Sequence, residues 1–174
     1  MDNAKLSEAN TRSRLRMNTL YYYAGLYDLL VAGTGNKVED FGIGFFTKYG
    51  DGGVDISPIG DLLKSDVKKL SQHLNISLDI INATPTDGLW DNGSTDEDQI
   101  GATYDELEWA MMECEKYNSH SIQTLCVDNI DINDELKYSK REYEVLVIYI
   151  RRHNKNQHKM NPIPICNIPI EFKF

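Results

Sequence analysis

One short apolar run sets the strongest limit on how this chain can fold. Leu29-Leu30-Val31-Ala32 predicts a buried strand, and the sequence offers no second run that predicts one as clearly. A single strand leaves backbone N–H and C=O groups without partners, which is costly where those groups are buried. We therefore expect strands from a missing half, or from another polypeptide, to pair with this run.

The strand leads into a glycine-rich segment with the composition of a ligand-binding loop. Glycines recur from Gly33 to Gly53, and they allow backbone N–H groups to approach a ligand closely. A hydroxyl at Thr34 and a carboxylate at Glu39 follow the strand directly. Lys48, Asp51 and Asp55 then add charge to the same segment. Because binding residues concentrate on loops held by a scaffold, this segment predicts a ligand-facing edge.

Three motifs in this region point to a family. They are Gly33-Thr34-Gly35-Asn36-Lys37-x-Glu39, Phe46-Thr47-Lys48-Tyr49-Gly50-Asp51-Gly52 and Pro58-Ile59-x-Asp61-Leu62-x-Lys64. The chain resembles the C-terminal half of ammonia-dependent NAD synthetases from about Leu6 to Pro169. Members of that family also carry a pyrophosphate-binding loop of the type Ser-Gly-Gly-x-Asp-Ser, and this string does not occur here.

The resemblance implies an α/β fold. Residues 1–174 would be a single partial domain, the C-terminal part of a Rossmann-like fold of the adenine-nucleotide alpha-hydrolase type, mostly helical with one or two core strands. No repeat or shift in composition marks a boundary within the chain. The N-terminal half would be either absent through truncation or supplied as a separate chain.

The activity implied by the resemblance is a two-step ligation. ATP adenylates the nicotinate carboxylate of deamido-NAD and releases pyrophosphate, and ammonia then attacks to give NAD and AMP. Both reactants are polyanions, so catalysis depends mainly on positioning and charge neutralisation. No cysteine lies in a glutaminase-type motif, so the nitrogen source would be free ammonia. The alternative is a nucleotide-binding or dimerising remnant that binds without catalysis.

Site residues follow from the same resemblance. On spacing alone, Glu39 would be a surface or capping acid and Lys64 an exposed lysine. Between Glu39 and Gly44 the chain is one residue longer than many family members. The implied roles are a magnesium ligand at Glu39, ATP contacts at Thr34, Lys64 and Thr86, and deamido-NAD contacts at Arg14, Lys48, Asp55, His158 and Lys159. One carboxylate suffices for Mg²⁺ when substrate phosphates and waters complete its coordination.

The N-terminal region predicts a helix with two apolar faces. Residues 1–9 are expected to be loose, and the helical pattern begins at Asn10. One face holds Leu15, Thr19, Tyr22 and Leu26, and the other holds Met17, Tyr21 and Ala24. We expect the domain core to cover one face and a second subunit of a homodimer to cover the other. Arg12 and Arg16 share a face, whereas Arg14 points elsewhere and could reach a ligand.

Further helix signals follow along the chain. Ser65 and Asp66 form a candidate N-cap for a helix with Val67, Leu70 and Leu74, and this helix start places Lys64 where anions bind. Two capping boxes are predicted, Ser94-x-x-Glu97 and Thr103-x-x-Glu106. The second precedes a helical face that we assign to the core rather than to a cofactor, consisting of Tyr104, Leu107, Met111 and Cys114.

The remaining segments are less regular. Asn82–Asp98 is rich in turn residues and suits either a mobile lid or an inert surface loop. Asn118–Ser139 resembles a linker. Glu142–Ile150 fits a strand or a helix, and the family resemblance favours the helix. Pro162–Cys166 is expected to be extended and to lie along a surface groove.

Composition excludes several classes of protein. The net charge is −9 and no Lys or Arg occurs from Leu70 to Glu115, which argues against nucleic acid as a partner. No long apolar run predicts a membrane span, and the start lacks a signal-peptide pattern, so a cytoplasmic location is expected. The three cysteines are scattered and fit reduced thiols. Val38 stands where a dinucleotide fingerprint needs its third glycine, and neither a Walker loop nor a Gly-x-Ser-x-Gly elbow is present.

Overall fold

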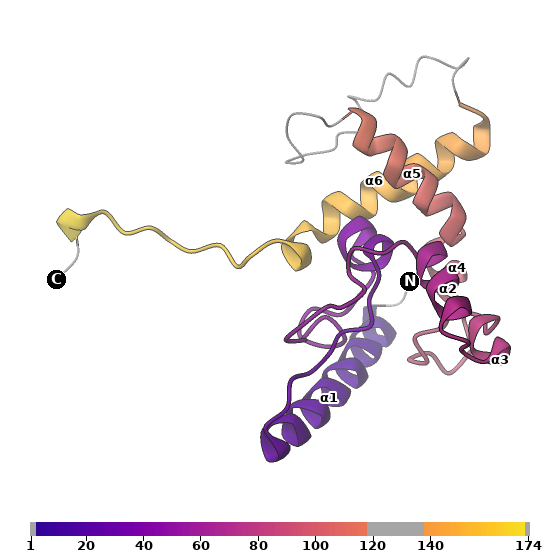
Figure 1. Cartoon of the computed structure of the whole chain (residues 1–174). Coiled ribbons are helices and arrows are strands. Elements are labelled where there is room, and N and C mark those ends of the chain that lie inside the picture. Colours follow the sequence, from indigo (N-terminus) through magenta and orange to yellow (C-terminus); the bar gives the residue numbers. More distant parts are fainter. Residues whose placement is uncertain (1–2, 118–137, 173–174) are drawn as a thin grey trace.

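The computed structural model describes residues 3–117 and 138–172, and most of its regular structure is helical. Figure 1 shows the arrangement of the helices. The predicted linker over 118–139 lies almost wholly outside the described residues. The elements are α1 (Asn3–Tyr27), the π-helix η1 (Lys37–Ile43), α2 (Lys64–His73), α3 (Leu78–Ile81), α4 (Asp96–Ile100), α5 (Tyr104–Tyr117), α6 (Lys140–Met160) and the 3₁₀-helix η3 (Ile170–Phe172).

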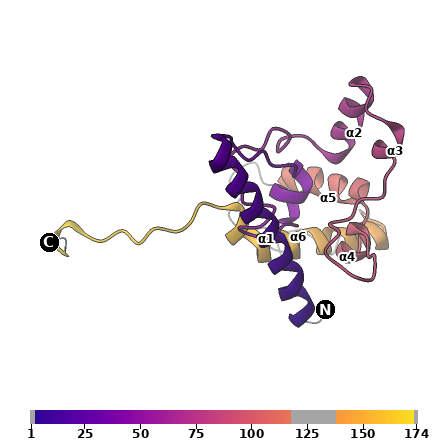
Figure 2. The same ribbon diagram turned by 90° about the horizontal axis from the view of Figure 1, so that it is seen from below.

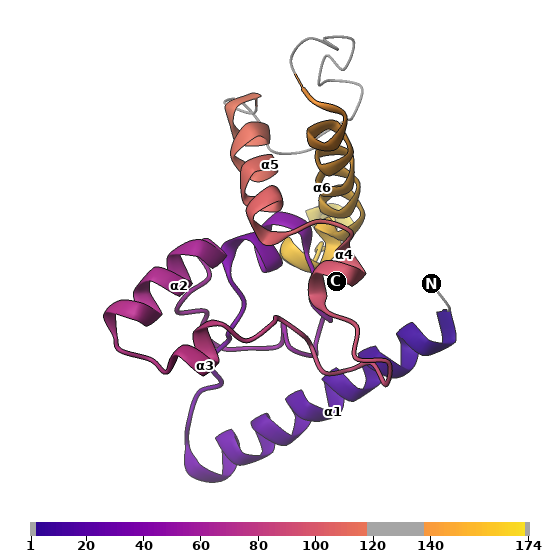
Figure 3. The same ribbon diagram turned by 90° about the vertical axis from the view of Figure 1, so that its right-hand side faces the viewer.

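The core lies where η1, α5 and α6 meet. Val38 and Ile43 of η1 pack in one buried cluster with Leu107 of α5 and with Leu146 and Ile150 of α6. Figures 1 and 3 both show α5 and α6 side by side. The helical prediction for 142–150 is confirmed, because that segment lies within α6.

The predicted core face of α5 is also confirmed. Tyr104, Leu107, Met111 and Cys114 are all buried. At the start of this helix the Thr103 N–H donates to the Glu106 carboxylate at 2.9 Å, and the Glu106 N–H donates to the Thr103 hydroxyl at 3.3 Å. The second predicted capping box is therefore present.

Two predicted helix starts need correction. The box at α4 consists of Thr95 and Asp98, one residue after the predicted Ser94 and Glu97, because Thr95 has the extended backbone of an N-cap. The N-cap of α2 is Leu63 without a side-chain cap, rather than Ser65 or Asp66. Tertiary structure supplies the missing acceptor: the Ser65 N–H donates to Glu108 Oε1 of α5 at 2.8 Å.

Helix α1 starts earlier than expected. Residues 3–9 are helical rather than loose, and Ala9 is buried. Of the two apolar faces, Met17, Tyr21 and Ala24 are buried or half-buried. The face with Leu15, Tyr22 and Leu26 is exposed (57–66%), so nothing in the described chain covers it. Figures 2 and 3 show α1 as a long helix lying across one side of the molecule.

The predicted buried strand is not formed in the described residues. Ala32 and Ile56 make one isolated parallel bridge. Val31 is buried, but Leu29 and Leu30 are 62% and 68% exposed. A parallel pair needs neighbouring strands to extend its ladder. The described chain supplies none, so the expected core strands reduce to two short extended segments.

The C-terminal tail is extended but does not lie in a groove. Its residues from Asn161 to Ile170 are exposed, with Ile165 at 82%. Figure 1 shows this segment leading away from the helices, which contradicts the predicted surface groove. Among the described helices, none combines the length and apolar character required to cross a membrane.

Candidate functional site

Glu39 is fixed at the start of η1 by its neighbour Asn36. The Asn36 side chain, 2% exposed, accepts hydrogen bonds from the N–H groups of Val38 and Glu39 at 3.1 Å each. The Glu39 carboxylate in turn accepts from the Asn36 N–H at 3.4 Å. This reciprocal cap satisfies donors that a helix start leaves unpaired, and it fixes where the Glu39 side chain begins.

The π-helical geometry of η1 is compatible with the prediction that the segment between Glu39 and Gly44 is one residue longer than in many family members. The Gly44 N–H donates to the Glu39 carbonyl, five residues back, and Gly44 has a φ of 59°. A π-turn holds one more residue than an α-turn, so the longer segment still closes against the core. Gly35 is required nearby, since a Cβ there would lie 2.0 Å from an Asp40 oxygen. Burial, together with Glu39 and Asp51, raises the pKa of Asp40 to about 7.

Glu39 and Lys64, which lie 25 residues apart, form an ion pair. Lys64 Nζ is 2.8 Å from Glu39 Oε1, and both side chains are largely buried. The same ammonium lies over the Tyr104 ring, 4.7 Å from its centroid. Lys64 opens α2, but Glu108 already accepts from the Ser65 N–H there. Anion binding at this helix start would therefore depend mainly on the lysine charge.

Tyr104 connects this pair to a second carboxylate. Its hydroxyl donates to Asp96 Oδ2 at 3.1 Å, and burial, with the negative charges of Glu39 and Asp96, raises the pKa of Tyr104. Asp96 is 8% exposed, and its other oxygen, Oδ1, is buried without a hydrogen-bond partner among the described residues. Burial raises the pKa of Asp96, and the Tyr104 hydrogen bond only partly opposes this. Sequence reasoning missed both residues, because Asp96 lies in a capping run and Tyr104 on a core face.

Four of the five residues expected to hold deamido-NAD lie together. Arg14 Nε donates to the Lys48 carbonyl at 3.3 Å, and Lys48 Nζ donates to the His158 carbonyl. Lys159 Nζ donates to the carbonyls of Gly44 and Phe46 at 2.7 Å each. Burial lowers the pKa of Lys159. These contacts join α1, the loop after η1 and the end of α6 into one cationic cluster.

The other expected residues are not in these clusters. Asp55 accepts from the Tyr21 hydroxyl at 3.1 Å and from the Val31 N–H at 2.8 Å, so it holds the two extended segments together. Thr34 is exposed and makes no side-chain hydrogen bond within the described residues. The Thr86 hydroxyl donates to the Ser94 carbonyl at 3.4 Å and accepts from the Gly88 N–H at 3.2 Å. Its contacts thus stay within its own loop.

That loop is attached to α1. Arg12 donates to the Leu89 carbonyl at 2.7 Å. Arg16 donates to the carbonyls of Asp87 and Gly88 at 3.1 and 3.0 Å. Arg12 and Arg16 therefore share a face, as predicted, while Arg14 reaches a different segment. The two arginines fix the 82–98 loop over the helix that carries Arg14.

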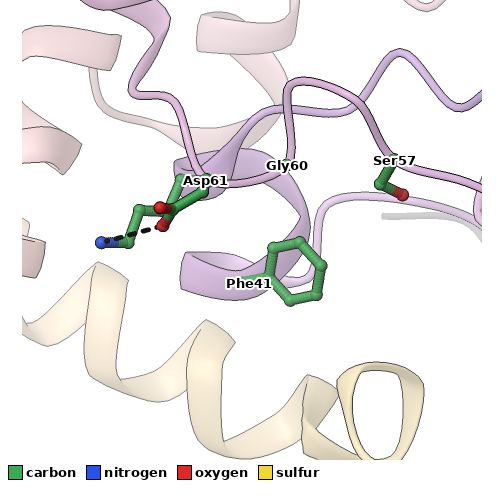
Figure 4. A pocket seen from close by; sticks show the side chains of 5 residues that line it. Phe41, Ser57, Gly60 and Asp61 are labelled. Atoms are coloured by element: carbon green, nitrogen blue, oxygen red, sulfur yellow. Dashed lines mark ion pairs between the residues drawn. The ribbon is translucent and has the colours of Figure 1, made fainter.

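Two pockets lie near these clusters. One of about 370 Å³ is lined by Lys37, Phe41, Ser57, Gly60 and Asp61, and Figure 4 shows the Phe41 ring below the loop that carries Gly60. None of the expected site residues lines it. The other, of about 390 Å³, is lined by residues that include Lys68, Pro85, Glu97 and Tyr104. Tyr104 thus contributes both to this pocket and to the Glu39 cluster.

Comparison with known proteins identifies the family. A family model described as NAD synthase matches residues 1–162. The chain belongs to the NAD synthase family. An NH(3)-dependent NAD(+) synthetase of Staphylothermus marinus is 33% identical over 167 residues, which are 96% of this chain and 56% of that protein. One from Methanococcoides burtonii is 50% identical over 101 residues, 58% of this chain and 38% of that protein.

Two solved structures contain a region with a similar fold. An NMN synthetase from Francisella tularensis matches with a TM-score of 0.70 and 33% identity, covering 94% of this chain and 58% of that one. An NH3-dependent NAD synthetase from Campylobacter jejuni gives a TM-score of 0.61 and 25% identity, covering 93% and 56%. The chain therefore spans about half the length of the relatives it matches.

Proposed function

We propose that this chain supplies the C-terminal half of an enzyme that amidates deamido-NAD with ammonia at the expense of ATP. The products are NAD, AMP and pyrophosphate, formed through an adenylated intermediate. The observation that carries this proposal is the Glu39–Lys64 ion pair at 2.8 Å. It joins the two positions at which the family places a metal ligand and a phosphate-binding lysine.

The cations of the chain suit two crowded polyanions. Lys64 can move its point charge from Glu39 to a phosphate of ATP, because a lysine ammonium sits on a flexible stem. Arg14 and Lys48 hold deamido-NAD together with His158 and Lys159, and their mutual contacts restrict their motion before a ligand binds. Pre-positioned charges act on the reacting groups without reorganisation, which is where such sites gain most. Thr34 and Thr86 contact ATP, and Asp55 contacts deamido-NAD.

The residues around Glu39 fit a divalent cation. Mg²⁺ is bound by one or two carboxylates plus phosphates and waters, and the Glu39 charge acts on the buried carboxyl of Asp96, whose Oδ1 has no hydrogen-bond partner among the described residues. No cluster of three His, Cys, Asp or Glu side chains is found among residues 3–117 and 138–172. Substrate phosphates and waters would complete the coordination, with Glu39 as the main protein ligand. When bound, Mg²⁺ neutralises phosphate charge during adenylation.

The site also needs residues from outside this part of the family fold. The short extended segments at Ala32 and Ile56 are a place where strands of an N-terminal half would add. That half would bring the Ser-Gly-Gly-x-Asp-Ser loop for pyrophosphate, either in the same polypeptide or in another. The exposed face of α1 fits a second copy of the chain in a homodimer. The substrates are deamido-NAD, ATP and ammonia.

A second candidate is a nucleotide-binding or dimerising remnant without catalysis. The observation that favours it is that Lys64, the expected phosphate ligand, is already neutralised by Glu39. In a remnant this pair would be structural only. The two candidates differ in whether adding an N-terminal half produces catalysis.

Reconstitution separates the two candidates. We expect no NAD from deamido-NAD, ATP, Mg²⁺ and ammonium with this chain alone, and NAD formation when a family N-terminal half with the Ser-Gly-Gly-x-Asp-Ser loop is added. Glu39→Gln should lower the reconstituted rate at least about 100-fold, because a metal ligand is lost. Glu8→Gln, an exposed acid of α1, is the matched control. Nicotinate mononucleotide should be assayed beside deamido-NAD, since one similar structure is of an NMN synthetase. Assembly without activity would favour the remnant.

A further inference from the structure

We propose that Asp96 is a second carboxylate ligand of the divalent cation at Glu39. When the cation is absent, the Lys64 ammonium takes the place of the cation beside Glu39. The inference rests on the proposed function, because it concerns the metal of the same site. It adds a residue from α4 to a centre otherwise assigned to Glu39 of η1 alone.

The first support is the state of the Asp96 carboxyl group. The side chain is more than nine-tenths buried, and Tyr104 satisfies only Oδ2. Oδ1 is buried and has no partner among the described residues. A buried carboxylate oxygen without a partner costs free energy, and proteins keep such groups where a ligand or ion satisfies them. A cation that bound Asp96 Oδ1 would supply the partner that this oxygen lacks.

The second support is the position of this group relative to Glu39. The Tyr104 hydroxyl donates to Asp96 Oδ2 at 3.1 Å, and the Lys64 ammonium, which is paired to Glu39 at 2.8 Å, lies 4.7 Å from the centroid of the same tyrosine ring. Asp87 adds a further negative charge to the surroundings of Asp96. Carboxylate oxygens are the protein ligands that Mg²⁺ and Mn²⁺ prefer. Two carboxylates gathered around Tyr104 and Lys64 are therefore a suitable pair of ligands for a hard cation.

The third support is the charge balance with Lys64. Two carboxylates and one ammonium leave this group of residues with a net charge of −1 when all three are ionised. Lys64 is paired to Glu39 at 2.8 Å and lies over Tyr104, so it neutralises only one of the two acids. A divalent cation would neutralise both carboxylates and release the ammonium. The displaced Lys64 is then free for a phosphate, which links cation binding to ATP binding.

Binding of Mn²⁺, used in place of Mg²⁺, tests the proposal without substrates. The full chain is titrated with Mn²⁺, and free Mn²⁺ is measured by electron paramagnetic resonance. We expect one site, weakened at least about tenfold by Asp96→Asn and by Glu39→Gln. Asp105→Asn, an exposed carboxylate at the start of α5, should bind like the unchanged chain. Circular dichroism confirms that each variant is folded.

Lys64→Gln is the independent variant, and it keeps the test decisive if Asp96→Asn does not fold. Removing the competing ammonium should tighten Mn²⁺ binding severalfold, whereas a purely structural Lys64 would leave it unchanged or weaken it. The proposal is overturned if the unchanged chain has no Mn²⁺ site, if folded Asp96→Asn binds as tightly as the unchanged chain, or if Lys64→Gln does not bind more tightly. Because no turnover is measured, these outcomes are separate from failure of the reconstituted amidation.

Discussion

Two regions of this molecule differ in whether they contain a hydrophobic core of their own. The cluster of η1, α5 and α6 buries Val38, Ile43 and Leu107 completely, and α6 alone contributes Val145, Leu146 and Ile150 to the same core. Helix α1 has 25 residues, of which three are buried, and exposes leucines and tyrosines along its length. One region contains its own core, and the other exposes apolar side chains to solvent.

The candidate site lies along the boundary between these regions. Glu39 lies on η1 and Tyr104 on α5, two helices whose other side chains form the core cluster. Arg14 belongs to α1, and Asp55 holds the extended segments. The core thus supports one part of the candidate site, whereas we propose that strands of an N-terminal half complete the part beside Ala32 and Ile56. This division explains why we expect the chain to fold in part but not to turn over substrates alone.

The largest expected effect tests the packed region. Leu146→Ala in α6 should lower the free energy of unfolding by about 2 to 5 kcal/mol, because a fully buried leucine leaves a cavity. Leu26→Ala in α1, at a side chain 57% exposed, should change it by no more than about 0.5 kcal/mol. Urea denaturation measures both. Equal losses of unfolding free energy would show that Leu26 of α1 is as important for stability as Leu146 of the core.

The next effect concerns the exposed face of α1. Tyr22 is 66% exposed, and in a homodimer it would be buried at the interface. Tyr22→Ala should then weaken self-association by about tenfold or more, since interface tyrosines are frequent hot spots. Sedimentation equilibrium measures this, with Lys5→Ala on the same helix as control. A chain that stays monomeric at high concentration would contradict the proposed homodimer.

The smallest effect depends on pH and lies at the edge of the packed region. Arg141 binds Glu106 through two bonds of 2.7 Å and lowers the pKa of that carboxyl to about 2. A lowered pKa adds stability above the unfolded pKa, and this stability is lost as the pH falls from about 4.5 towards 2. Arg141→Gln should therefore lower the free energy of unfolding slightly at pH 7, because the pair is exposed, and by less at pH 3.

Urea denaturation at the two pH values measures this difference. Arg151→Gln on the exposed side of α6 serves as the control and should show no such pH dependence. If the cost of Arg141→Gln were as large at pH 3 as at pH 7, the ion pair would not be its source.

Local patterns predicted the packed region well. The α5 face, the Thr103 capping box and the helix over 142–150 depend on periodicity and on side chains within four residues, which a sequence displays directly. The same local rules misplaced the cap of α2, because its acceptor is Glu108, more than forty residues away. They also misplaced the α4 box by one residue, since Ser94 and Thr95 are chemically equivalent as caps.

The strand and the acidic partner of Glu39 required information that the sequence does not contain. Leu29 and Leu30 have the composition of a buried strand, but they are exposed because no described strand packs beside them. Asp96 has no distinguishing motif, and only its packing against Tyr104 sets it apart from Asp98 two residues later. The motif residues themselves were found through family resemblance, and the structure brings Glu39 to Lys64 and Arg14 to Lys48.

Hydrogen exchange tests the central claim most directly, namely that this chain is one half of a shared α/β fold. Exchange is measured by mass spectrometry on the chain alone and after a family N-terminal half is added. Amides of α6 should exchange slowly in both samples, whereas those in 29–33 and 54–57 should exchange fast alone and at least about 100-fold more slowly after addition. If the two polypeptides co-elute and these segments still exchange fast, the chain does not complete its sheet in this way.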